Sequence, residues 1–551
     1  MKKYWIPLIV SMGIALMLWI GILIGESRLM DALPQYQPQN NAVAGASQEG
    51  LSSTEASAKL SYLFDLLRDR YVDTLNLKKL VEDAIPTIVE ELDPHSMYIP
   101  AEELNGVNEQ LEGSFSGVGI QFNIQNDTIM VIQVVSGGPS EKVGLMPGDR
   151  IVTVDDSLFV GKTINNDKVM KTLRGEKGSQ VKLGIRRNTS KDLLTFEVTR
   201  GDIPVNSVVA QYMEGNIGYV KVDNFGRNTY NEFFNALIAL KARGAKGYLL
   251  DFRGNGGGFM EICCAMVNEF LPKDALIVYT EGRMQPRRDN TADGHGNFQN
   301  DPVVVLIDEW SASASEIFAG GLQDNDRAMV VGRRSFGKGL VQQQFDLYDG
   351  SALRLTIARY HTPSGRCIQK PYSMGEGADY AMDLVNRYER GEFYSQDSIH
   401  LADSLKFTTV GGRTVYGGGG IMPDYFVPSD TSYISAYYNK SISQLYAFAF
   451  KYTDKHRDQI SKFTNFHELE QYLRQQNLLP EFITFATPVL GKPTPVELKK
   501  SGDDLNRLLI AYIMRQCKDE NYFYQEFNSS DKTYLKGLDV LKSLVPISQE
   551  K

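Results

Sequence analysis

Four short, almost wholly apolar segments constrain the fold of this chain most. They are "IGYVKVDNF", "AKGYLLDFRGN", "PVVVLIDEW" and "AMVVGRR", and helical stretches such as "TYNEFFNALIALKARG" and "ASEIFAGGLQDN" lie between them. Continuous apolar runs of this kind are typical of strands buried on both faces, which alternate with helices in α/β folds. The sequence therefore predicts an α/β domain over residues 203–430, with a polar, mobile insertion at about residues 375–406.

The blocks on either side have helical periodicity. In residues 53–104, Leu60, Leu63, Phe64 and Leu67 recur at three- and four-residue spacings. The last block, residues 431–551, is also predicted to be helical and contains no motif to which chemistry can be assigned. Residues 26–52 are predicted to form a flexible linker, because they are rich in Gln, Asn, Ala and Pro.

The first residues predict a membrane anchor. From Tyr4 to Gly25 there is no charged side chain, and 22 residues of helix span about 33 Å, enough to cross a bilayer. A cleaved signal peptide usually has an apolar run of only about 7–15 residues, so residues 1–25 are interpreted as a signal anchor. Lys2 and Lys3 place the N-terminus in the cytoplasm. The sequence predicts a single-pass protein of the inner (cytoplasmic) membrane, with the rest of the chain on the periplasmic side.

Charge and cysteine content exclude several classes. The net charge of −9 argues against a general nucleic-acid-binding protein. None of the four cysteines has the spacing of a zinc site, and the sequence predicts no metal. Cys263 and Cys264 suit buried thiols on an apolar helix, whereas Cys367 and Cys517 could be joined in an exported protein.

Residues 105–202 consist of short strands separated by glycines, which predicts a small barrel or sandwich. This block resembles a PDZ domain. "SGVGI" matches its carboxylate-binding loop, "GPSEKVGLMPGDRIVTVDD" the segment that closes the barrel, and "KVMKTLRG" the helix beside the groove. The resemblance implies that Gly117, Val118, Gly119 and Ile120 bind a peptide C-terminus. Successive backbone amides hold such a carboxylate, and a strand edge holds the residues before it.

Lys338 ends a G-x-x-x-x-G-K pattern that begins at Gly332 and suggests a phosphate-binding loop. Such a loop requires Ser or Thr after the lysine and a helix that starts there. Here Gly339 follows, and "LVQQQFDL" has the alternation of a strand. The pattern therefore does not predict a nucleotide site, and Lys338 needs another role.

Ser313, in "DEWSASASE", lies where a predicted strand turns into a helix. Ser313 has two interpretations. The structural one is that Ser313 and Glu316 form a capping box at the start of the helix. The functional interpretation is that small neighbours let a substrate approach Ser313 and that free helix amides stabilise an oxyanion. The segment "DFRGNGGGF" (Asp251–Phe259) is either a tight turn or a second source of such amides. It does not match the dinucleotide-binding fingerprint G-x-G-x-x-G, because Phe259 stands at the position of the last glycine.

A serine hydroxyl needs a base. None of the six histidines (His95, His295, His361, His400, His456 and His467) lies in a serine-hydrolase context, and there is no G-x-S-x-G elbow. Lys338 lies among Phe336, Gly337, Gly339 and Leu340, which could bury it and lower its pKa. Gln342, four residues further on, could orient the amine.

Taken together, these motifs, with "YHTPSGR" and "GGIMPD", resemble the C-terminal processing peptidases, also called tail-specific proteases. The resemblance covers about residues 60–428. It implies that Ser313 is the nucleophile, Lys338 the general base and Gln342 its positioning residue. The amides of Ala314 and of Gly257 or Gly258 would form the oxyanion hole. Ser311 and Ser315 compete for the role of nucleophile, but the spacing in the family selects Ser313. Gly256 departs from the family pattern, and the insertion and the C-terminal block lie outside the common core.

The sequence thus predicts a multidomain α/β (α+β) protein. Its parts are a transmembrane helix, a helical segment, a PDZ β-barrel, an α/β serine peptidase core and a helical C-terminal extension. The expected function is that of a membrane-anchored serine endopeptidase without a cofactor, which captures exported proteins by their apolar C-termini and cleaves them through an acyl-enzyme. The alternative is a catalytically silent PDZ scaffold. Further partners could be other copies of the same chain, in a homo-oligomer, or an adaptor protein. Arg174 is either a contact between the PDZ domain and the core or a solvated surface arginine.

Overall fold

A computed structural model describes residues 52–545, apart from residues 126, 136, 188–189 and 376. The predicted membrane anchor lies outside the described residues, as does the predicted linker up to residue 51. Within the described part of the chain, no helix combines the length and the apolar character needed to cross a bilayer.

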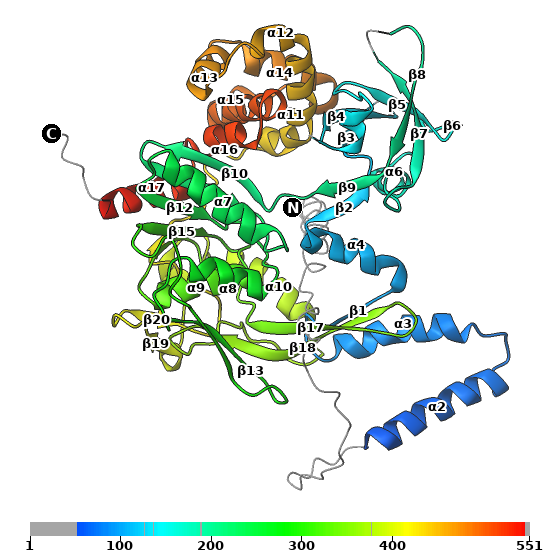
Figure 1. The fold of residues 1–551 in the computed structure, drawn as a ribbon, viewed down its shortest axis with the longest axis vertical. Coiled ribbons are helices and arrows are strands. Elements are labelled where there is room, and N and C mark those ends of the chain that lie inside the picture. Colours follow the sequence, from blue (N-terminus) through cyan, green and yellow to red (C-terminus); the bar gives the residue numbers. More distant parts are fainter. Residues whose placement is uncertain (1–51, 126, 136, 188–189, 376, 546–551) are drawn as a thin grey trace.

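The N-terminal segment begins with a helix that extends away from the rest (Figure 1). This helix, α2 (Ser53–Arg70), has no buried residue, and a capping box of Ser52 and Glu55 fixes its start. It is followed by α3 (Leu77–Glu90), β1 (Met97–Ile99) and α4 (Ala101–Glu112). Strand β1 pairs with β18 (Ala352–His361) of the α/β domain, so the segment around it belongs structurally to that domain.

The second block is a small β-domain with strand order β3-β4-β5-β7-β8 and β6 paired to β5. Its strands are β3 (Ile120–Gln125), β4 (Thr128–Val134), β5 (Arg150–Val154), β6 (Ser157–Leu158), β7 (Gln180–Arg186) and β8 (Leu194–Thr199), with helices α5 (Pro139–Lys142) and α6 (Asn166–Leu173). Alternating apolar residues fill its core. A ribbon of β2 (Ser114–Gly117) and β9 (Gly201–Pro204) links it to the rest.

The central sheet has strand order β10-β11-β12-β15-β16-β21. All pairs are parallel except β10 with β11. The strands are β10 (Val208–Glu214), β11 (Ile217–Val222), β12 (Gly247–Asp251), β15 (Val303–Ile307), β16 (Met329–Gly332) and β21 (Tyr425–Phe426). Strands β11, β12 and β15 are buried throughout, because helices cover both faces.

One face of this sheet packs against α7 (Thr229–Ala242), α8 (Met260–Asn268) and α9 (Ala314–Asp324). The other face packs against α17 (Lys532–Leu544), close to the C-terminus (Figure 1). The last helix that the structure describes is therefore part of the α/β domain, whereas the sequence predicted it only as part of a separate helical block.

A second sheet carries β1-β18-β13-β14, with β17 paired to β18. Its strands are β13 (Leu276–Glu281), β14 (Arg288–Thr291), β17 (Leu340–Asp346) and β18 (Ala352–His361), and a separate hairpin is formed by β19 (Lys406–Thr408) and β20 (Thr414–Tyr416). The predicted insertion is not a mobile loop. It contains α10 (Gly377–Glu389), with Tyr380, Leu384 and Arg387 buried, and two short 3₁₀ turns, Gln396–Ser398 and Asp403–Leu405.

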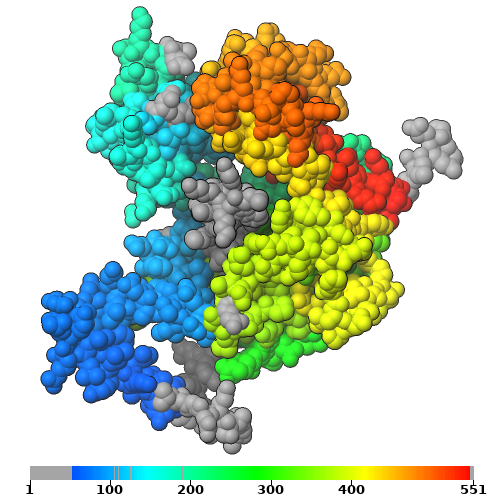
Figure 2. All heavy atoms as spheres, turned by 180° about the vertical axis from the view of Figure 1, so that it is seen from behind, coloured from blue at the N-terminus to red at the C-terminus, as the bar shows by residue number. Residues whose placement is uncertain are grey.

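The remaining helices form a separate bundle with its own core. They are α11 (Ala436–Lys455), α12 (Arg457–Ile460), α13 (Phe466–Arg474), α14 (Leu478–Leu490), α15 (Pro495–Cys517) and α16 (Glu520–Asn528). The bundle lies beside the small β-domain in both views (Figures 1 and 2). Met130 and Ile132 of β4 pack there against Phe450 and Tyr446 of α11. All four cysteines are free, so Cys367 and Cys517 are not joined.

Candidate active site

Ser313 lies at the N-terminus of α9, directly after the turn that follows β15. Its backbone has φ 56° and ψ −115°, in a region that glycine adopts much more readily than serine. Among the described residues, every other non-glycine with positive φ is an aspartate. Such strain costs about 1–3 kcal/mol and is often found at functional sites.

The neighbouring serines are engaged elsewhere. The Ser311 hydroxyl donates to the Phe252 carbonyl at 2.9 Å, and the Ser315 hydroxyl donates to the Asn255 carbonyl at 2.8 Å. The two bonds tie the turn before α9 and the first turn of α9 to the loop after β12. These two competitors of Ser313 therefore have structural roles.

The glycine-rich loop lies directly against Ser313. A Cβ on Gly257, which has φ 107°, would be 2.8 Å from the Ser313 Cβ and 3.0 Å from the Ala314 nitrogen. A Cβ on Gly258 would be 2.4 Å from the Phe225 carbonyl oxygen. Only glycine allows this close approach, so the loop is more than a tight turn.

Three amides near Ser313 were candidates for an oxyanion hole. The Gly257 N–H donates to the Asn255 side-chain oxygen at 2.8 Å. Within the described chain, the Ala314 and Gly258 amides have no hydrogen-bond partner. Free amides at this point are suited to bind an oxyanion.

Lys338 is buried, with 4% of its surface exposed. Burial, helped by the nearby Arg354 cation, lowers the pKa of its amine to about 7, against the opposite effect of the Asp93 and Glu316 carboxylates. The Nζ atom donates to Gln342 Oε1 at 3.0 Å, so the structure brings together this predicted pair. Within the described residues no hydrogen bond joins the Lys338 amine to the Ser313 hydroxyl. Strand β17 follows Lys338, in agreement with the prediction against a phosphate-binding loop.

Glu316 connects the two halves of the site, a role that the sequence did not reveal. Its carboxylate accepts the backbone N–H of Ser313 and that of Lys338, each at 2.8 Å. It also accepts the Gly337 N–H at 2.7 Å and the Ser335 hydroxyl at 2.5 Å. Burial raises the pKa of Glu316 to about 7, against the effect of these four donors. The capping-box spacing was the only signal, and it indicated a local role.

Two further residues were not predicted. The Tyr360 hydroxyl, on β18, faces the carbonyls of Ser313, at 3.1 Å, and of Lys338. The His95 carbonyl accepts the side-chain N–H of Gln342 and so fixes the amide that binds Lys338. Burial holds the pKa of His95 well below its ordinary value, and the Lys338 and Lys370 cations lower it further. Both residues lie far from Ser313 in the sequence, and only the fold brings them here.

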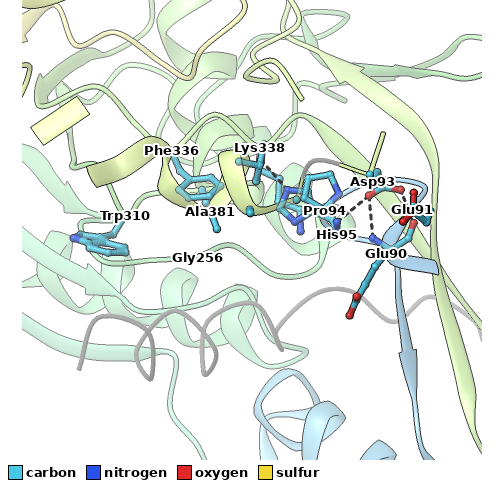
Figure 3. Close-up of a pocket in the computed structure, with 16 residues that line it drawn as sticks. Glu90, Glu91, Asp93, Pro94, His95, Gly256, Trp310, Phe336, Lys338 and Ala381 are labelled. Carbon is cyan, nitrogen blue, oxygen red and sulfur yellow. Dashed lines mark hydrogen bonds between the residues drawn. The ribbon is translucent and has the colours of Figure 1, made fainter. Parts of the chain in front are cut away.

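A cavity of about 400 Å³ opens beside Lys338 (Figure 3). Its walls come from the loop before β1, the turn before α9, the loop before β17 and helix α10. Ser313 lies on a smaller cavity, of about 10 Å³, together with Gly258, Leu340 and Tyr360.

The predicted peptide site lies at the edge of the small β-domain, where β3 is the outermost strand of its sheet. Gly119 has φ 78°, and Val118 is buried. Ile120 begins β3, whose outer edge pairs with no described strand of this sheet. Arg174 is not a solvated arginine, because it pairs with Glu109 of α4 and lies 4.4 Å above the Phe115 ring. It joins the small β-domain to the N-terminal segment.

Comparison with known proteins identifies three parts of the chain. Residues 216–377 match peptidase family S41, residues 116–200 match the PDZ domain, and residues 433–519 match a family of unknown function.

Two similar curated proteins cover most of the chain. A carboxy-terminal processing protease, CtpB, of Bacillus subtilis is 32% identical over 68% of this chain and 77% of its own length. A carboxy-terminal-processing protease of Bartonella bacilliformis is 34% identical over 68% of this chain and 84% of its own length. The solved structure of a photosystem II D1 C-terminal processing protease is 30% identical and covers 57% of this chain and 84% of that one, with a TM-score of 0.34.

Proposed function

The chain belongs to the carboxy-terminal processing proteases of peptidase family S41, and we propose that it cleaves its substrates with Ser313 as nucleophile and Lys338 as general base. Membership makes it a serine-type peptidase with a PDZ domain, as the sequence motifs indicated. The assignment of the individual residues is our proposal.

The observation that carries this proposal is the environment of Lys338. Its amine is buried, its hydrogen-bond partner is the neutral amide of Gln342, and its pKa is lowered to about 7. The Asp93 and Glu316 carboxylates act against this shift, but burial is its largest cause. A lysine of this kind is neutral in a large fraction of molecules near pH 7 and can accept a proton.

The reaction then proceeds in two halves. Lys338 takes the proton of the Ser313 hydroxyl as its oxygen attacks the substrate carbonyl, and the free amides of Ala314 and Gly258 stabilise the oxyanion. The protonated Lys338 gives its proton to the leaving amine, and an acyl-enzyme remains. Lys338 next takes a proton from a water molecule as its oxygen attacks the acyl carbon, and it returns the proton to the Ser313 oxygen as the ester bond breaks and the acid product leaves. Gln342 keeps the amine in position throughout.

The PDZ domain would supply the substrate. An apolar C-terminus adds as a strand along the free edge of β3, and its carboxylate binds the amides of the loop from Gly117 to Ile120. The preceding, unfolded segment then extends to the peptidase core. The predicted anchor at residues 1–25 would keep the enzyme at the inner membrane with this machinery on the periplasmic side.

Cleavage of an unfolded protein with an apolar C-terminal tail tests the proposal. The Ser313→Ala and Lys338→Arg proteins are expected to lose at least about a hundredfold in kcat/KM, since a guanidinium cannot act as a base. Replacement of the exposed Ser443 by Ala is the matched control and should leave the rate unchanged. Equal cleavage by wild type and Ser313→Ala would overturn the assignment of the nucleophile. Protease accessibility in intact and opened spheroplasts tests the location independently.

A further inference from the structure

Helix α10, from the insertion, forms one wall of the cavity beside Lys338. Ala378, Tyr380 and Ala381 of this helix line the same cavity as Lys338, and the labelled Ala381 and Phe336 lie close to one another in Figure 3. The insertion therefore reaches the proposed base. A segment that the sequence placed outside the common core contributes directly to the site.

This wall is held firmly in place. The Tyr380 hydroxyl is 2.8 Å from Nε2 of His95, whose carbonyl binds Gln342. Arg387, with 1% of its surface exposed, donates to the carbonyls of Ser335 at 3.0 Å and Arg334 at 2.7 Å. Helix α10 is thus fixed to both sides of the cavity, on the loop before β1 and on the loop before β17. A wall that cannot move away constrains what the cavity can hold.

The chemistry of the cavity is that of an apolar subsite. Trp310, Phe336 and Pro94 supply apolar walls, and the small side chains of Ala378 and Ala381 leave space between them. A volume of about 400 Å³ accommodates any single side chain. Burial of an apolar side chain in such a site is favourable in proportion to the area removed from water.

The outer end of the cavity is acidic rather than apolar. Glu90 and Glu91, at the end of α3, line it and are exposed. Neither forms an ion pair with a described residue. Asp93 is deeper, and its oxygens accept bonds from the backbone of His95 and Ser96 and from the Ser96 hydroxyl. An acidic substrate side chain would meet like charge here.

We propose that α10 is a specificity element, which makes this cavity a subsite for a bulky apolar side chain close to the scissile bond and excludes acidic ones. The proposal rests on the role of Lys338 as the base, because that role places the cavity at the reaction centre. It identifies Ala381 as the residue that leaves room for the substrate, and Glu90 and Glu91 as the residues that reject acidic side chains.

A cleavage-site profile tests this. Wild-type protein, Ala381→Trp and Met382→Trp would be given the same mixture of synthetic peptides with apolar C-termini, and mass spectrometry would identify every cut. Met382 is the next residue on the same helix, is 47% exposed and does not line the cavity. Wild type should favour Leu, Met, Phe or Tyr at one fixed position relative to the cut. Ala381→Trp should shift that position towards Gly and Ala by about tenfold, and Met382→Trp should match wild type.

A second variant does not depend on the fit of a tryptophan. Glu90→Lys/Glu91→Lys changes two exposed positions, and it should admit Asp and Glu at the same substrate position about fivefold more often, with a smaller effect at high salt. An unchanged profile in both Ala381→Trp and Glu90→Lys/Glu91→Lys, or a wild-type profile without any fixed apolar position, would overturn the proposal. Those results leave cleavage intact, whereas failure of the proposed function would appear as cleavage by Ser313→Ala.

Discussion

At the scale of single residues, the site is organised around charges that burial makes costly. Lys338 and Glu316 are both buried, and burial moves the pKa of each towards its neutral form, in both cases to about 7. The carboxylate accepts the backbone amide of Lys338 and not its amine, so the lysine is not locked as a cation. Glu316 can therefore hold Ser313 and Lys338 at a fixed separation without removing the basicity of the amine.

The pH dependence follows from these two groups. Protonated Lys338 cannot accept the Ser313 proton, so kcat/KM for peptide cleavage should rise with pH and reach half its plateau near pH 7. The apparent value belongs to the coupled pair. The Glu316→Gln variant shows which group causes this pH dependence. If Lys338 causes it, the residual kcat/KM of the variant should still rise with pH. A profile that is flat from about pH 5 to 9 would contradict the role of Lys338.

The same shifts affect stability with opposite signs. The pKa of Lys338 is lowered from 10.5, so its contribution to stability is complete above that value and decreases as the pH falls towards about 7. The pKa of Glu316 is raised from 4.5, so its contribution is complete below that value and decreases as the pH rises towards about 7. Near neutral pH both groups therefore make the site less stable than it could be.

Gly257 gives a test of close packing at the nucleophile. Gly257→Ala places a Cβ 2.8 Å from that of Ser313 at a φ of 107°, so it should lower kcat/KM by at least about tenfold. Gly254→Ala is the matched control, because Gly254 also has a positive φ, of 72°, but a Cβ there has open space. Peptide cleavage rates and thermal unfolding would be measured for both. If the two variants lose activity equally, backbone strain alone is the cause and contact with Ser313 is not.

At the scale of elements, the sequence was informative where the pattern is local. The buried strands β11, β12 and β15 could be predicted from their apolar runs. The local pattern left Ser311, Ser313 and Ser315 as alternatives, and only the resemblance to the family selected Ser313. Helix α10 could not be predicted as part of the site, because the contacts that tie it to the site, with His95 and Ser335, join residues that are distant in the sequence. His95 contributes through its backbone carbonyl, which every residue has, so its residue type does not indicate this role.

The packing of helix α17 on the central sheet also could not be predicted from the sequence, and a core substitution tests it. Leu541 is fully buried against the central sheet, so Leu541→Ala should cost about 2–5 kcal/mol in the free energy of unfolding. Leu544, on the same helix, is 42% exposed, and Leu544→Ala should cost less than about 0.5 kcal/mol. Urea unfolding of the full chain measures both. Equal small losses would mean that α17 is not part of the peptidase core.

At the scale of the whole molecule, the helical bundle connects the PDZ domain to the catalytic loops. On one side Phe450 packs against Met130 and Ile132 of the PDZ domain. On the other side Asn528, at the end of α16, accepts a hydrogen bond at 3.3 Å from Arg253, in the loop that carries Gly257 and Gly258. No role for this C-terminal block could be predicted from the sequence, because such contacts depend on three domains that meet only in the folded chain.

The contact at Phe450 determines whether the bundle holds the PDZ domain. A buried carboxylate is costly, so Phe450→Asp should separate the two domains and leave the β2–β9 ribbon and the Arg174–Glu109 pair as connections. Small-angle scattering should then show a larger radius of gyration, and a protease should cut the ribbon faster. Met130→Asp, on the opposite side, should have the same effect. Ile442→Asp, at an exposed position of α11, should behave as wild type.

Cleavage of two substrates then tests whether the helical bundle holds the PDZ domain in the position from which it delivers substrates. A short peptide without an apolar tail does not need the PDZ domain, so Phe450→Asp should cleave it at the wild-type rate. A protein with an apolar C-terminal tail would, on the proposed function, be delivered by that domain. Its kcat/KM should then change at least about threefold, because the effective concentration of the delivered segment depends on where the domain is held. If scattering shows separation but both substrates are cleaved as by wild type, the bundle does not hold the PDZ domain for delivery. If scattering is unchanged, the contact at Phe450 is not what fixes the two domains.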